Sequence, residues 1–237
     1  MNSGVMTRVA PALIAMQPLL NRLVFHGIET CQGQLDSAEA RVRPSVSQTV
    51  ALHALATSVV ERMAPELSAA GFIKIRRGAD HEEWGYRDLV RIVLSSATGS
   101  ETESVDSMAR EYAVLLTRTA QVGDGTAMRV SIRVSTPAAQ LALYWRAHEA
   151  SAVSIMESEW IEDLIELVVR RREIIDEVSA APAELRELIA RSAGKFIAED
   201  GCRWLLRRAL PDTRQVPAFA EHARDRFVRL AALAAKP

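Results

Sequence analysis

The sequence predicts an α+β fold, in which a small antiparallel β-meander of about four strands packs on a long helix and an all-helical C-terminal half follows. Two observations lead to this prediction. Residues 45–136 combine one helical stripe with several short β-rich segments, whereas residues 137–237 show helical periodicity only. We therefore expect three parts: an N-terminal helical segment and connector over 1–44, an α+β domain over 45–136, and a helical domain over 137–237.

The N-terminal segment is expected to be helical in pieces. Residues 5–25 are apolar, and Pro11 and Pro18 interrupt them at positions where a helix starts or kinks. Residues 26–44 contain glycines and a proline among residues of mixed polarity, so we interpret them as a connector.

A long helix is predicted over residues 45–70. Ser45 and Gln48 fit a capping box, and Gly71 suits the left-handed position that ends a helix. The apolar stripe at helical spacing consists of Leu52, Leu55, Val59, Met63 and Leu67. This helix is expected to cover one face of the sheet.

The predicted strands follow this helix. Their ranges are Phe72–Arg77, Leu89–Ser96, Tyr112–Val122 and Met128–Ser135. The last one alternates apolar residues, from Met128 to Val134, with polar ones, as a half-buried antiparallel strand does. Gly123-Asp124-Gly125 indicates a hairpin before it, and residues 97–107 are predicted to form a polar loop.

The C-terminal half reads as helices. Thr136 and Pro137 supply an N-cap and a first helical residue, and Ser154 and Glu157 fit a second capping box. The predicted helices cover residues 137–150, 155–178, 182–199, 201–209 and 217–235.

Composition excludes several classes of protein. The formal net charge is -1, so bulk charge does not draw the chain to nucleic acid or an anionic membrane. No secretory signal pattern and no run of apolar residues long enough to span a membrane is present, and we expect a cytoplasmic protein without membrane contact. Cys31 and Cys202 lack CxxC spacing and are expected to be free thiols.

The densest polar segment is predicted to be a loop between two strands. Its candidate site residues are Asp80, His81, Glu82, Glu83, Arg87 and Asp88. A histidine among carboxylates can bind a metal or transfer protons. The spacing matches no metal signature, however, and the alternative is a solvated hairpin that Trp84 and Tyr86 anchor to the sheet. We expect neither a metal nor a cofactor.

Recognised catalytic motifs are absent from the sequence. His148-Glu149 resembles the start of a zinc-protease HExxH motif, but Ala152 stands where the second histidine is needed. Motifs of the GxGxxG, Walker A and GxSxG kinds are also missing. The sequence therefore favours a protein that is not an enzyme.

A candidate basic surface lies near the C-terminus. It consists of Arg203, Arg207 and Arg208, with Trp204 among them. Nucleic-acid binding is one interpretation. Interleaved acidic residues, including Asp200 and Asp212, favour a solvated or partner-facing helical surface instead.

Several short segments resemble the nucleotidyltransferase toxins of the abortive-infection type. Leu23-Val24-Phe25-His26-Gly27 resembles the segment that enters the family's Gly-Gly turn, although Ile28 replaces the second glycine. Arg43-Pro44-Ser45 resembles the opening of the metal-binding motif, whose two aspartates would fall on Ser47 and Thr49. The strand 129–135 lacks the third carboxylate, and 159–164 matches a family helix in part. The resemblance implies an inactive or strongly diverged member, because magnesium binding needs those carboxylates.

Three functions follow as expectations. The first is a non-catalytic binding or assembly protein that acts through its helical C-terminal half, with a protein partner or a second copy of itself. The second is a diverged or inactive nucleotidyltransferase-like protein of a toxin or phage-defence system. The third is a nucleic-acid-binding protein.

Overall fold

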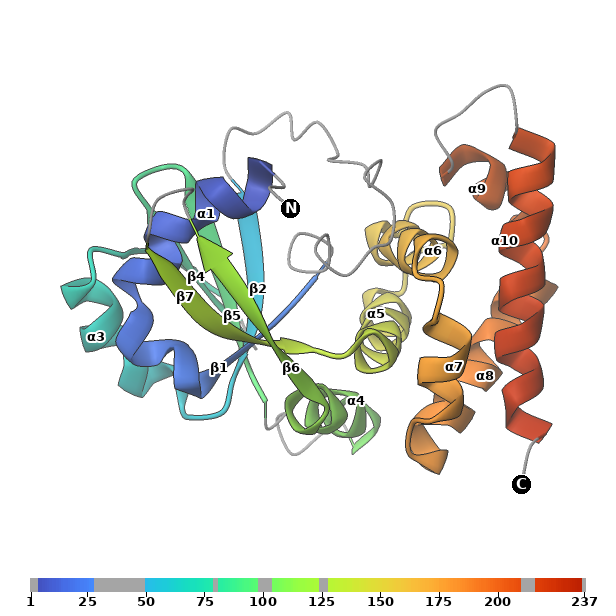
Figure 1. Cartoon of the computed structure of the whole chain (residues 1–237), viewed down its shortest axis with the longest axis horizontal. Coiled ribbons are helices and arrows are strands. Elements are labelled where there is room, and N and C mark those ends of the chain that lie inside the picture. Colours follow the sequence, from blue (N-terminus) through green and yellow to red (C-terminus); the bar gives the residue numbers. More distant parts are fainter. Residues whose placement is uncertain are drawn as a thin grey trace. The chain divides into compact units, whose positions relative to one another are not determined.

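The computed structural model describes residues 4–27, 50–78, 81–97, 104–123, 128–209 and 216–235. These residues fall into two compact units, one ending at Thr136 and one beginning at Pro137 (Figure 1). We call them the sheet unit and the helical unit. None of the described helices is long and apolar enough to cross a membrane.

The described residues of the sheet unit contain a seven-stranded mixed sheet in the order β3-β4-β5-β2-β1-β7-β6. Strands β2 and β5 are parallel, as are β1 and β7, whereas the other neighbouring pairs are antiparallel. The strands are β1 (Leu23–His26), β2 (Val50–Ala56), β3 (Ile73–Arg77), β4 (His81–Tyr86), β5 (Val90–Ser96), β6 (Thr117–Gly123) and β7 (Arg129–Ser135).

The expected antiparallel meander on a long helix is wrong. Residues 50–56, predicted as part of the helix 45–70, form β2 in the middle of the sheet. Because a central strand is covered on both faces, it lacks alternation, and its apolar residues fit helical spacing equally well. Val59, a member of the predicted stripe, is 51% exposed. The capping-box residues Ser45 and Gln48 lie outside the described residues.

The predicted strand Tyr112–Val122 is also partly wrong. Residues 104–115 form helix α4 (Ser104–Leu115), and β6 begins at Thr117. Buried Ala109 and Ala113 are one helical turn apart, and this weak signal was outweighed by the β-prone residues beside them. The other three predicted strands are confirmed as β3, β5 and β7, and β6 and β7 pair antiparallel as the hairpin signal requires. The turn residues 124–127 lie outside the described residues.

One face of the sheet carries the apolar core of this unit. Helix α1 (Gly4–Ala15), the 3-10 turn η1 (Gln17–Arg22) and helix α3 (Ala64–Ala69) contribute buried residues to it, with η3 (Val60–Met63) beside α3. Figure 1 shows α1 and α3 on the same side of the strands. The largest fully buried side chains from the strands and helices include Phe25, Leu13, Leu52 and Leu67. We call this side of the sheet the core face.

The helical unit is built around aromatic residues of α5, α8 and α10. The Trp145 and Phe196 rings lie 5.8 Å apart, and the Phe196 and Phe227 rings lie 4.7 Å apart. The helices are α5 (Pro137–Ser151), α6 (Glu159–Arg170), α7 (Ile174–Ser179), α8 (Ala183–Ala198), α9 (Cys202–Ala209) and α10 (Val216–Ala231), and the 3-10 turn η4 (Ala232–Ala235) follows.

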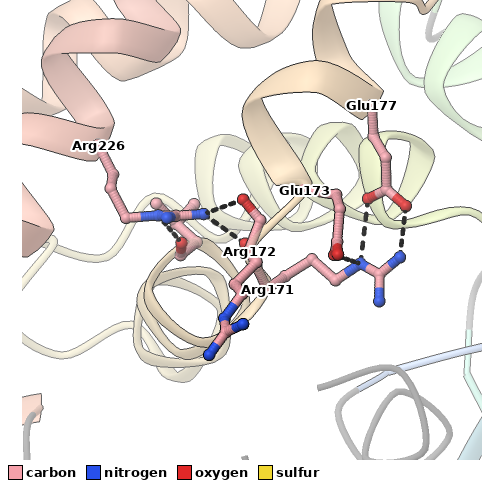
Figure 2. A network of polar contacts seen from close by, with 6 residues as sticks. Arg171, Arg172, Glu173, Glu177 and Arg226 are labelled. Carbon is pink, nitrogen blue, oxygen red and sulfur yellow. Dashed lines mark hydrogen bonds and ion pairs between the residues drawn. The ribbon is translucent and has the colours of Figure 1, made fainter. Parts of the chain in front are cut away.

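The helix predicted over 155–178 is divided into α6 and α7. Arg226 of α10, only 8% exposed, donates from Nε to Val168 O at 2.6 Å and from Nη2 to Arg171 O and to Arg172 O, the latter at 3.0 Å (Figure 2). These carbonyls close α6, so a side chain of a distant helix satisfies groups that a continuing helix would satisfy itself. Arg226 thus stabilises the break between α6 and α7.

A second arginine joins the two halves of the divided helix. Arg171 donates to both carboxylate oxygens of Glu177, at 3.3 and 2.7 Å, and its Nε lies 3.6 Å from Glu173 (Figure 2). The predicted capping box at Ser154 does not start a helix. Helix α6 begins after Ser158, whose side chain makes no capping hydrogen bond.

Candidate functional site

A row of polar side chains crosses the second face of the sheet. His26 of β1 pairs with His53 of β2, and His53 pairs with Val93 of β5. Val93 pairs with Glu83 of β4, which pairs with Arg76 of β3. Directly paired residues of neighbouring strands point to the same side of a sheet. These side chains therefore share one face, opposite the core face, which we call the polar face.

Glu83 is the acidic centre of this row. Its side chain is 8% exposed, and it accepts a hydrogen bond from Arg76 at 2.6 Å. Arg91 lies 3.5 Å from its second oxygen, and His81 Nε2 lies 3.6 Å from its first. Burial works to raise the pKa of Glu83, but the hydrogen bond from Arg76 and the charges of Arg76 and Arg91 outweigh it and lower the pKa. The ionised carboxylate therefore orients arginines from two different strands.

His26 and His53 form a close pair beside this acidic centre. Their ring centroids lie 5.8 Å apart, with the planes inclined by 47°. Burial, followed by the nearby His53 and Arg110, lowers the pKa of His26 from 6.5 to about 3. Burial, followed by the charge of Arg91, lowers the pKa of His53 from 6.5 to about 4. Both imidazoles are thus neutral at pH 7 and lie in a positive electrostatic environment.

Helix α4 brings a further cation to the polar face. Arg110 donates from Nη1 to Ser96 O, at the end of β5, at 3.3 Å. Arg133 of β7 donates from Nη2 to Val114 O at 3.1 Å and so fastens the other end of α4. The position of Arg110 near His26 is therefore fixed by hydrogen bonds to two strands.

The polar face carries an excess of positive charge. Among the strand residues that the structure describes, Glu83 is its one carboxylate, whereas Arg76, Arg91 and Arg133 all lie on this side. Arg110 adds a charge from α4. Such an arrangement favours an anionic ligand, because Arg76 and Arg91 already meet at Glu83 and the neutral histidines can still donate a hydrogen bond.

The prediction of a loop around the candidate polar residues is wrong. Residues 81–86 form β4, a strand inside the sheet, and Asp80 lies outside the described residues. Trp84 and Tyr86 are buried on the core face, so the segment has the period of two of a strand. Its charged side chains concealed that period, because strands seldom bury adjacent glutamates.

The structure separates the predicted candidate residues. Glu82 lies on the core face, where it pairs with Lys74 and accepts a hydrogen bond from Trp84 Nε1 at 3.2 Å. Arg87 and Asp88 form the turn after β4. Of the predicted set, His81 and Glu83 are brought together on the polar face.

Sequence reasoning missed the other contributors to the polar face. These are His26, His53, Arg76, Arg91, Arg110 and Arg133. His53 lies in the segment predicted as the helix 45–70, so its place on a strand was not recognised. A histidine at the matching position of two apolar segments, in Leu23–His26 and Val50–Ala56, was the available signal.

The magnesium ions that the resemblance implies do not fit the described residues. The positions of the metal-binding aspartates are Ser47 and Thr49, which lie outside the described residues. Within the described ranges, no group of three or more His, Cys, Asp or Glu side chains could hold a metal ion. Glu83 is engaged by Arg76 and Arg91, which compete with any cation for its oxygens.

The candidate basic surface near the C-terminus lies on α9. Arg203 and Arg207 are exposed, and Arg208 donates to Glu162 at 2.7 Å and to Met156 O at 2.9 Å. The Arg208 guanidinium lies 4.9 Å from the centre of the Trp204 ring. This surface belongs to the helical unit and is considered separately from the polar face.

Comparison with known proteins gives distant likenesses only. No protein-family model and no curated protein matches the chain. The solved structure of JHP933 from Helicobacter pylori is similar over 99% of this chain and 92% of its own, with a TM-score of 0.46 and 7% identity. A second H. pylori structure, provisionally described as a nucleotidyltransferase, covers 99% of this chain and 95% of its own with the same TM-score and identity. Similarity at this level leaves the activity of this chain open.

Proposed function

We propose that the sheet unit binds a phosphate-bearing ligand, a nucleotide, on its polar face. The observation that carries the proposal is the row from His26 through His53 and Glu83 to Arg76, in register across neighbouring strands. Arginines such as Arg76 and Arg91, which meet at Glu83, form charge-assisted hydrogen bonds with phosphate oxygens. This agrees with the second of the three functions expected from the sequence, a diverged nucleotidyltransferase-like protein.

An apolar shelf beside the arginines favours a nucleotide over a simple anion. Ile73 and Ile75 of β3 are 74% and 59% exposed. Ile73 pairs with Gly85, which also pairs with Arg91. The Ile75 Cδ1 atom lies 3.0 Å from the place that a Cβ on Gly85 would take, so this side chain covers the glycine. A ligand with a flat apolar base and a charged phosphate matches such a surface.

We propose binding without a transfer step. Nucleotidyl transfer in the resembling family depends on magnesium held by carboxylates. On the polar face Glu83 is already paired with Arg76 and Arg91, and its depressed pKa reflects those cations. The proposed role is therefore recognition of the nucleotide, which is the role that a diverged member would retain.

The proposal is tested by thermal unfolding with ATP, CTP, GTP, UTP and inorganic triphosphate, followed by calorimetric titration of the best ligand. A ligand that binds the folded state raises the melting temperature. Arg91→Ala and Arg110→Ala are each expected to raise Kd about tenfold, since a hydrogen bond to a charged group contributes about 1.5–3 kcal/mol.

The matched control is Arg77→Ala. Arg77 belongs to the same sheet and its side chain is 64% exposed, but it pairs with Glu61 and its strand partner is Glu82, on the core face. Binding should therefore be unchanged in this variant. No shift with any of the ligands, or an equal loss of affinity for Arg77→Ala, would contradict the proposal.

The assembly function expected from the sequence has less support. Of the large hydrophobic residues in the described part of the helical unit, the exposed ones are Val153, Trp204 and Val228, at 41%, 52% and 42%. They come from three different segments, and singly exposed residues of this kind are ordinary on a monomer. Association with a second copy or with a protein partner stays a prediction. The molar mass of the purified chain in solution tests the self-association directly.

A further inference from the structure

Helix α9 has a polar side with an unusual composition. Cys202, Leu205 and Leu206 are buried, whereas the four remaining side chains from Arg203 to Arg208 are exposed. At 3.6 residues per turn, those four occupy one arc of roughly 140°. The arc contains three arginines and one tryptophan and no acidic residue. We call it the α9 surface.

Two of its arginines are available to a ligand. Arg203 and Arg207 are one helical turn apart, and within the described parts of the chain neither makes an ion pair. Arg224 of α10 lies close enough to the start of α9 to act on Cys202, since Arg203 and Arg224 both lower the pKa of that thiol, although burial raises it overall. Arg203 follows the first residue of α9 and Arg207 lies in its last turn, so the two exposed guanidinium groups lie along the helix.

Trp204 is held in a position suited to stacking. Its side chain is 52% exposed, although a tryptophan gains most by burial. Arg208 lies over its ring at 4.9 Å, and Glu162 and Met156 O fix Arg208 in turn. The ring thus stacks against a guanidinium that a hydrogen bond to Glu162 anchors to α6. Solvation explains exposed arginines, but it does not explain an exposed and oriented indole.

We propose that the α9 surface binds single-stranded nucleic acid. Phosphates pair with Arg203, Arg207 and Arg224, and a base stacks on Trp204 from the side opposite Arg208. Proteins that bind single strands combine basic side chains, which contact the nucleic-acid backbone, with aromatic side chains on which the bases stack. The one acidic side chain in contact with the surface, among those described, is Glu162, and its charge is used by Arg208. This proposal does not depend on the nucleotide site of the sheet unit.

Fluorescence anisotropy with labelled 12-nucleotide RNA and DNA strands tests the proposal on the full chain. The wild type is expected to bind, with affinity that falls as salt rises. Arg203→Glu with Arg207→Glu should weaken binding by about tenfold or more and reduce the slope of log K against log salt by about 1.4, since each phosphate contact on a single strand contributes about 0.7.

Further variants separate stacking from charge. Trp204→Ala should weaken binding by about tenfold with no change in salt slope, because base stacking on an aromatic ring is uncharged. The control is Arg191→Glu, which changes an exposed arginine of α8 and should leave binding unaltered. Absence of binding at low salt, or equal weakening by Arg191→Glu, would overturn the proposal. Equal competition by a poly-glutamate peptide would also overturn it, since the surface would then recognise acidic polypeptide.

Discussion

At the scale of single residues, Arg226 is the side chain whose loss should disturb the helical unit most. Its guanidinium is buried and satisfies carbonyls at the end of α6, and Figure 2 shows it reaching from a different helix. Removal of the guanidinium leaves those carbonyl oxygens buried without a donor. An unsatisfied buried acceptor costs its full desolvation free energy. The division between α6 and α7 depends on this contact.

Arg226→Met should therefore lower the free energy of unfolding by about 3 kcal/mol, because more than one charge-assisted hydrogen bond is lost. The control is Arg229→Met, which shortens an exposed arginine of the same helix. Urea denaturation followed by circular dichroism gives both values. Equal stability of the two variants would show that the buried network contributes nothing.

The histidine pair should make the stability of the fold depend on pH in the acid range. His26 and His53 have folded-state pKa values of about 3 and about 4, below the value of 6.5 expected when the chain is unfolded. Below pH 6.5 the unfolded chain takes up protons that the folded chain does not, so the stability present above that pH is lost as pH falls toward 4 and then 3.

Substitution of one histidine should flatten this dependence. We expect His53→Gln to lose less stability between pH 6.5 and 4 than the wild type, since glutamine does not titrate there. Denaturation at four pH values measures the slope, and His222→Gln, at an exposed position of α10, serves as the control. An unchanged slope in His53→Gln would mean that the pair is not protected from protons in the folded state.

At the scale of elements, the turn between β4 and β5 has an unfavourable sequence. Arg87 and Asp88 have φ of 50° and 55°, and Leu89 N–H donates to Tyr86 O at 3.1 Å. Positive φ at both central positions is the requirement of a type I′ turn, which favours Asn-Gly. The Arg87 guanidinium lies over the Tyr86 ring, 5.0 Å from its centre.

Asp88→Gly should relieve this strain and raise the free energy of unfolding by about 0.5–1 kcal/mol. A side chain in the left-handed region costs about 1–2 kcal/mol, and the larger conformational entropy that glycine loses on folding offsets part of this gain. Asp176→Gly, in helix α7, should instead lower stability by about 0.3 kcal/mol, the difference in helix propensity between the two residues. Thermal denaturation distinguishes the two directions. A loss of stability in Asp88→Gly would show that contacts of Asp88 outweigh the strain.

Strands could be predicted where one face is solvated, and not where both faces are covered. β7 was predicted because Val130, Ile132 and Val134 alternate with polar residues. β2 was missed because its neighbours are β5 and β1 and its residues are buried or half-buried throughout. Its parallel pairing with β5 joins residues about forty positions apart, which no local pattern reveals.

At the scale of the whole molecule, the same limitation applies to the site. The polar face takes residues from β1, β2, β3, β4, β5, β7 and α4, and the site residues predicted from the sequence include only those of β4. His81 and Glu83 could be found because they are two residues apart in a charged segment. His26 and His53 become neighbours through strand pairing, and Arg110 through hydrogen bonds of a helix to strand ends. A site made by long-range pairing is visible only once the sheet order is known.

The most direct measurement is a titration of the isotope-labelled chain with a nucleoside triphosphate, followed by backbone amide NMR over the described residues of both units. We predict the largest shift changes at His53, Glu83 and Arg91, together with an increase in the pKa of His53 as phosphate neutralises its cationic surroundings. Shift changes confined to other elements, such as α9, or none at saturating nucleotide, would contradict the assignment of the polar face as the ligand site.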